Sequence, residues 1–215
     1  MTSIPKPLKF LSPHYVSLKT YYETLREDNF KKEVADLISV LGITMSEDGS
    51  YDSLNFALKG TRLGLESWGH QYIRSLGAEV ADKYNALLSE NQDATHLDFL
   101  VDIVVPHLMK THEEPEAVDL LLEVEQIEKI INVADENTYQ KVCQYLMSCA
   151  KYAADQEEMS QIYTSAFRIY MKLGKFPSAL LVAQKLNVQE MIDEAMNTCE
   201  DPIMLKQLCL MLGRQ

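Results

Sequence analysis

The sequence lacks the motifs that build most nucleotide-binding and hydrolytic sites. It contains neither G-x-x-x-x-G-K-[ST] nor G-x-G-x-x-G, the glycine-rich loops whose backbone amides cradle phosphates. The segment from Gly64 to Gly69 is close to the nucleophile elbow G-x-S-x-G, but it has one residue too many and no strand is predicted before it. The carboxylates stand in solvated runs, without an apolar pocket that would make one a general acid. We therefore predict no enzyme and no cofactor.

Residues that could bind a metal ion are poorly spaced. The four cysteines form no C-x-x-C pair, and His107 and His112 are five residues apart, whereas i, i+4 spacing places two ligands on one helix face. A zinc site formed by these histidines with Glu113 and Glu114 is the less favoured alternative, because zinc takes three or four well-spaced ligands. Cys143 and Cys199 fall on apolar helix faces, and we predict that both are buried thiols.

Signals for secretion or membrane insertion are also missing. The sequence has no N-x-[ST] acceptor, no signal peptide and no apolar run long enough to span a bilayer. Together with the cysteine pattern, this predicts a reducing compartment, the cytoplasm or the nucleus. The net charge of −12 and the isoelectric point of about 4.8 argue against a general nucleic-acid binder and against binding to an anionic membrane.

Negative charge is concentrated in one segment. Residues 113–136 contain nine acidic residues and a single lysine, Lys129. We interpret this segment as a solvated helix face. The alternative is a docking surface for a basic partner, for which the candidate interaction residues are Glu113, Glu114, Glu116 and Glu123.

Helical periodicity is strongest between residues 159 and 215, where apolar residues recur at i, i+3 and i+4 over four successive segments. Gly174 is placed to cap the first segment in a left-handed conformation, and Pro177 opens the second. Asn187, with Glu190 three residues later, is predicted to cap the third, and Asp201-Pro202 to open the fourth. Because the loops are short, the helices must fold back on one another. We predict an all-α fold of stacked antiparallel helical hairpins, a right-handed α-solenoid.

The remainder of the chain is also predicted to be helical, with no convincing strand. Residues 1–12 are interpreted as an extended arm, followed by a single solenoid-like domain over 13–215, with a possible subdivision near 110–114. Helices are expected over about 13–26, 29–41, 51–59, 65–89 and 95–106, where Pro106 should kink or end the helix. An acidic helix should run from Pro115 to Ile131, and a further one from Asp135 or Asn137 to Ala150.

The last predicted helix is apolar nearly all round, because only two of the ten residues 203–212 are polar. A terminal helix of a solenoid should have a polar outer face, so we expect a downstream helix to cover this one. Met204, Leu208 and Met211 are the candidate residues for that contact. Methionines at helical spacing more often fill the core, and the alternative interpretation is that they line an adaptable groove for a partner.

Several stretches resemble one family, that of the proteasome non-ATPase regulatory subunit 2. They are residues 1–11, 13–15, 67–72, 125–126, 139–149 and 211–214. The resemblance implies that the chain is an N-terminal helical region, with a toroid of proteasome/cyclosome repeats missing downstream. Ser12 stands where the family has arginine, and the loop at Gly49 is diverged, so local surface contacts are not transferred.

The same resemblance implies a non-catalytic scaffold in the base of the regulatory particle. Its partners would be the ATPase ring and other regulatory-particle subunits. Through the full-length subunit they would also include ubiquitin-like shuttle receptors and a deubiquitinase, with no nucleic acid and no membrane. The residues alone leave a different function open, a free-standing helical-repeat adaptor that binds a peptide or partner helix in a groove.

Overall fold

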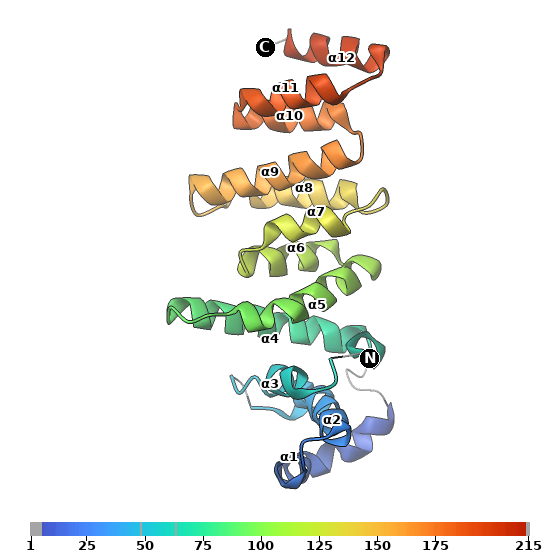
Figure 1. Ribbon diagram of the computed structural model, residues 1–215, viewed down its shortest axis with the longest axis vertical. Helices are drawn as coiled ribbons and strands as arrows, with labels where there is room; N and C mark the ends of the chain where they lie inside the picture. Colours follow the sequence, from blue (N-terminus) through green and yellow to red (C-terminus); the bar gives the residue numbers. More distant parts are fainter. Residues whose placement is uncertain (1–5, 48, 63, 214–215) are drawn as a thin grey trace. The chain divides into compact units, whose positions relative to one another are not determined.

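The structure, a computed structural model, describes residues 6–47, 49–62 and 64–213. Over these residues it contains twelve α-helices and four 3-10 helices, and no strand (Figure 1). The predicted all-α class is therefore confirmed. The chain divides into two compact units, residues 1–113 and 114–215, and the division falls in the segment 110–114 where a possible subdivision was expected.

Among its described residues the first unit contains five α-helices and three 3-10 helices, and its consecutive α-helices pack against one another. They are η1 (Lys6–His14), α1 (Tyr15–Thr24), α2 (Asn29–Met45), α3 (Asp52–Lys59), η2 (Leu65–Trp68), α4 (His70–Ser89), η3 (Thr95–Leu97) and α5 (Asp98–Lys110). The packing of α2 on α3 is close, because Gly42 brings the backbone of α2 to Ser53: a Cβ at this glycine would lie 3.1 Å from the Ser53 amide nitrogen. Beside this contact, the buried Ser39 hydroxyl donates to the Ser53 carbonyl and lies 2.8 Å from the Tyr72 hydroxyl.

Three expectations for the first unit are corrected. Residues 6–14 form η1, where an extended arm was expected through residue 12; residues 1–5 lie outside the described part. The helix predicted over 65–89 is divided into η2 and α4 by Gly69, whose φ of 108° interrupts a right-handed helix. Of the two outcomes expected at Pro106, a kink or an end, the end does not occur: α5 continues to Lys110, where burial of Val105, Leu108 and Met109 offsets the single backbone hydrogen bond that proline cannot make.

The second unit contains seven α-helices and one 3-10 helix among its described residues. They are α6 (Glu114–Glu123), η4 (Ile127–Lys129), α7 (Ile130–Val133), α8 (Tyr139–Cys149), α9 (Gln156–Lys172), α10 (Phe176–Leu186), α11 (Gln189–Thr198) and α12 (Pro202–Leu212). The pairs α8–α9, α9–α10 and α10–α11 pack in succession, and α12 also packs on α10. This order of packing is compatible with the predicted helical solenoid.

Small side chains allow the helices of the second unit to approach closely. Ala166 on α9, Ala179 and Ala183 on α10, and Ala195 on α11 are all fully buried. Gly174 adopts the expected left-handed conformation between α9 and α10, with a φ of 65°. The Asp201 carboxylate accepts a hydrogen bond from the Ile203 amide at the start of α12, as the Asp-Pro pair predicted.

Two expectations for this unit are corrected, both at residues in the left-handed conformation. The acidic helix predicted to reach Ile131 stops at Glu123, because Glu125 has a φ of 55° and the chain then restarts as η4 and α7. Asn187, also at a φ of 55°, ends α10 instead of capping α11. Asparagine tolerates the left-handed region better than most residues, so it can replace the more usual glycine at a helix end.

Candidate interaction surfaces

The described residues hold no group of three or more His, Cys, Asp or Glu side chains arranged to bind a metal ion. None of the helices in the described part is both long and apolar enough to cross a membrane. Cys143 and Cys199 are buried, as predicted, and burial raises the pKa of the Cys143 thiol to about 12. This thiol therefore remains protonated and unreactive near neutral pH.

The four acidic residues proposed as a docking surface differ in burial and in their partners. Glu113 is the last residue of the first unit and is half-buried, whereas Glu114 begins the second unit and is only 1% exposed. The Glu114 carboxylate pairs with the Lys141 ammonium, 3.4 Å away. Glu116 is half-buried, Glu123 is exposed, and both take part in polar interactions within the chain. Glu114 is therefore a structural residue, and Glu123 is the exposed member of the set.

Two histidines that are distant in sequence lie together in the first unit. The rings of His70 and His107 stack with their centroids 6.0 Å apart, and His70 Nε2 lies 2.8 Å from Glu113 Oε1. Three buried atoms of this cluster, His70 Nδ1, His107 Nε2 and Glu113 Oε2, have no hydrogen-bond partner. Burial lowers the pKa of His107; the nearby Glu66 and Glu113 oppose this effect, while His70 and Lys110 reinforce it. The less favoured zinc site grouped His107 with His112, whereas the structure places His70 beside His107.

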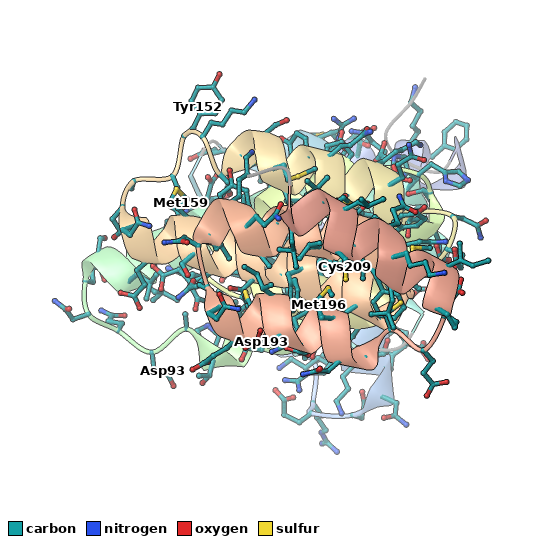
Figure 2. All side chains as sticks on the ribbon, turned by 90° about the horizontal axis from the view of Figure 1, so that it is seen from above. Asp93, Tyr152, Met159, Asp193, Met196 and Cys209 are labelled. Atoms are coloured by element: carbon teal, nitrogen blue, oxygen red, sulfur yellow. The ribbon has the colours of Figure 1, made fainter. Side chains whose placement is uncertain are left out.

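The apolar residues proposed on α12 face the interior of the second unit. Leu208 is fully buried against Leu180 and Cys199, and Met204 and Met211 pack on the same cluster. The exposed apolar residues of this helix are instead Ile203, at 78%, and Leu210, at 71%. Figure 2 shows the helix with Cys209, another exposed residue, and labels Met196 of α11, which also packs on the cluster. Because nearly every position of α12 is apolar, the sequence alone could not show which side is buried.

A groove not identified from the sequence lies along α10. It has a volume of about 480 Å³ and is lined by one residue of α8, one of α9 and five of α10: Met147, Tyr170, Ser178, Leu181, Val182, Gln184 and Lys185. Leu181 is 55% exposed at its rim, and the buried Gln184 Nε2 has no hydrogen-bond partner. Ser178, Leu181, Val182 and Lys185 have the spacing i, i+3, i+4 and i+7, a helical stripe that gave the only sequence signal for this site.

A smaller depression of about 360 Å³ lies on the same unit, and most of its lining residues are of polar types. Its lining consists of Glu128, Ile131, Ser160, Gln161, Thr164, Ser165 and Arg168. The Arg168 guanidinium pairs with the Glu194 carboxylate of α11, so the cation at this depression is already neutralised within the chain. The two sites therefore differ in charge as well as in size.

Consecutively packed helices define an all-α protein, and their order of packing is compatible with a helical solenoid. Comparison with known families refines this class: the family model described as the RPN1 N-terminal domain matches residues 1–215, and the chain belongs to this family.

Relatives of the chain in several organisms are proteasome regulatory subunits. The chain is 40% identical over 214 residues to the 26S proteasome non-ATPase regulatory subunit 2 homolog A of Arabidopsis thaliana. It is also 40% identical over 216 residues to the 26S proteasome non-ATPase regulatory subunit 2 of Dictyostelium discoideum, and 34% identical over 215 residues to the 26S proteasome regulatory subunit rpn1 of Schizosaccharomyces pombe. Each alignment covers 100% of this chain but only 24% of the relative. The chain thus spans about a quarter of the length of these proteins.

Proposed function

We propose that this chain is the N-terminal scaffold region of a regulatory subunit of the 26S proteasome and has no catalytic activity of its own. The observation that carries this proposal is the match of the RPN1 N-terminal domain model to residues 1–215, together with relatives named as non-ATPase regulatory subunits. The physical character of the chain supports it, because helices that pack consecutively with alanine at their contacts are typical of helical scaffolds that bind other proteins.

The proposed partners follow from this assignment. The region helps to dock the subunit on the ATPase ring and against other subunits of the regulatory particle. The full-length subunit recruits ubiquitin-like shuttle receptors and a deubiquitinase for ubiquitin-dependent protein degradation. The cytoplasm and the nucleus are the proposed locations. The net charge of −12 disfavours binding to nucleic acid or to an anionic membrane surface.

Purification of the tagged full-length protein from its own cells tests this proposal. We expect proteasomal ATPases and regulatory-particle subunits to co-purify in fixed ratios and to sediment with the tagged protein as one assembly. Lysine-reactive crosslinking of that assembly should join exposed lysines of this region, such as Lys185 and Lys206, to neighbouring subunits. A full-length protein that sediments apart from all proteasome subunits would refute the proposal.

The second candidate is a free-standing helical-repeat adaptor that binds a peptide or partner helix, and the groove along α10 is the observation that favours it. The sequence of the natural gene distinguishes between the two candidate functions. Continuation of the reading frame past Gln215 into glycine- and alanine-rich helical repeats supports the proteasome subunit, whereas a stop codon there supports the adaptor.

A further inference from the structure

The groove along α10 has the shape and composition of a docking site for a segment of another protein. Its volume of about 480 Å³ lies within the range of about 300–1,000 Å³ that is usual for ligand sites. Tyr170 and Val182 are buried in its wall, while Leu181 remains 55% exposed at the rim. An exposed leucine beside a depression offers an apolar anchor to a partner that lies across the surface, because an enclosed small molecule would not cover the rim.

The polar groups of the groove favour an acidic occupant. The chain has 32 acidic and 20 basic residues, yet no acidic side chain lines this groove. Lys185 supplies a cation there, and Gln184 Nε2 is a buried donor without an acceptor. Leaving a buried donor unpaired is unfavourable, so a carboxylate or carbonyl oxygen arriving at this point gains a hydrogen bond that the free chain does not make.

Lys185 is positioned by a neighbouring tyrosine, and no described ion pair neutralises its charge. Its ammonium lies 5.3 Å from the centroid of the Tyr163 ring and 3.5 Å from the Tyr163 hydroxyl. The described ion pairs of the chain do not include Lys185. The cation–π contact orients the side chain but leaves the positive charge uncompensated. At the smaller depression, by contrast, Arg168 is already paired with Glu194. Of the two sites, the α10 groove is therefore the one whose cation has no described ion-pair partner.

We propose that the groove binds an amphipathic segment of a partner protein that carries an acidic residue about one helical turn from an apolar anchor. The spacing follows from α10 itself, on which Leu181 and Lys185 are four residues apart and therefore about 6 Å apart along the helix axis. The apolar anchor packs against Leu181, Met147 and Val182. The carboxylate pairs with Lys185 and accepts a hydrogen bond from Gln184 Nε2. This inference does not depend on assembly into the proteasome.

A peptide selection on the 215-residue chain tests the inference. A displayed library of random twelve-residue peptides is selected on the wild-type chain, and binding of each enriched peptide is measured by fluorescence anisotropy. We expect enriched peptides to combine aspartate or glutamate with nearby apolar residues. Replacing that acidic residue with lysine should weaken binding at least tenfold, which corresponds to about 1.4 kcal/mol.

Variants of the chain assign the binding to this groove. Leu181→Asp should weaken binding at least tenfold, and Lys185→Glu should reverse the preference, so that the lysine-bearing peptide binds better than its acidic parent. Leu210→Asp and Lys206→Glu, matched exposed positions on α12 outside the groove, should leave binding unchanged. Circular dichroism confirms that each variant is folded, and Leu181→Ala replaces the aspartate variant if that one loses helicity.

Three results would overturn the inference: no peptide enriched with a dissociation constant below about 1 mM, enriched peptides that bind Lys185→Glu as they bind the wild type, or equal binding of acidic and lysine-bearing twins. Because the assay contains no other component of the proteasome, its failure leaves the proposed proteasomal role untouched. Failure of co-purification likewise leaves the groove untouched.

Discussion

Replacing Gly60 with alanine should destabilise the first compact unit by about 2–4 kcal/mol. The backbone is not the obstacle, because Gly60 has a φ of −75°, which alanine adopts readily. The obstacle is space. A Cβ at this position would lie 1.8 Å from Asp36 Oδ1 and 2.9 Å from Asp36 Cγ.

The Asp36 carboxylate cannot move aside freely, although it is the end of a side chain. It is only 5% exposed, and it accepts a 2.6 Å hydrogen bond from the Thr61 hydroxyl. The Thr61 amide, 3.2 and 3.3 Å from its two oxygens, also donates to it. A hydrogen bond to a charged group contributes about 1.5–3 kcal/mol, and displacing the carboxylate breaks both sets of contacts at once. Since such contributions are not additive, their combined loss is about 2–4 kcal/mol.

The chain offers a probe specific to this unit, because Trp68 is its only tryptophan and lies in the first unit. Urea unfolding followed by tryptophan fluorescence therefore reports the first unit, while circular dichroism at 222 nm, the usual helix signal, reports both units. Gly213→Ala is the matched control, since a Cβ there meets only the Cys209 carbonyl oxygen at an ordinary 3.5 Å. This control should leave the fluorescence transition unchanged.

A double-mutant cycle isolates the clash. In an Asp36→Ala background the carboxylate is gone, so Gly60→Ala should cost less than about 0.5 kcal/mol, or stabilise slightly by restricting the unfolded chain. If Gly60→Ala is tolerated in the wild-type background, or costs the same in both, the reasoning from Asp36 and Thr61 is wrong.

Other variants probe the remaining conclusions. Burial lowers the pKa of His107 below the ordinary 6.5, so at mildly acidic pH the unfolded chain binds a proton at this residue that the folded chain does not bind. The unfolding free energy should therefore fall as the pH drops below about 6.5, and it should fall less in His107→Gln. Urea melts at a series of pH values measure this difference. Ala183→Leu should cost the second unit about 1–3 kcal/mol by overpacking, measured by circular dichroism, and an unchanged melt would contradict the helix contact. Glu114→Gln should cost about 1–3 kcal/mol, because the carboxylate is buried and paired; a neutral effect in the same melts would mean that the pair contributes nothing. On α12, Leu210→Asp at an exposed position should reduce self-association, measured by light scattering, without loss of stability, and strict monomer behaviour of the wild type would refute this expectation. Leu208→Ala, at a buried position, should lower the unfolding free energy by about 2–5 kcal/mol.

The sequence by itself determined the secondary structure of this protein and many of its boundaries. Helical periodicity is a local property, so the segments around α9, α10 and α12 could be identified without their neighbours. Gly174 and Asp201 marked helix ends because glycine and aspartate satisfy the backbone in specific ways there. The boundary residues Gly69, Glu125 and Asn187 were misjudged, since a left-handed or otherwise positive φ at a single residue leaves the surrounding apolar pattern intact.

The tertiary structure alone decided which residues are available to a partner. Glu114 and Glu123 belong to the same acidic run, yet one is buried beside Lys141 and the other is exposed, because burial depends on contacts made across the fold. The sequence could not show which face of α12 is buried, because nearly all its faces are apolar. The structure shows that the buried face is the one that packs against Leu180 of α10. His70 meets His107, and Met147 meets the stripe of α10, only because distant helices pack together. Periodicity determines that a helix has an apolar face, but the pairing of faces is a long-range choice that local patterns do not encode.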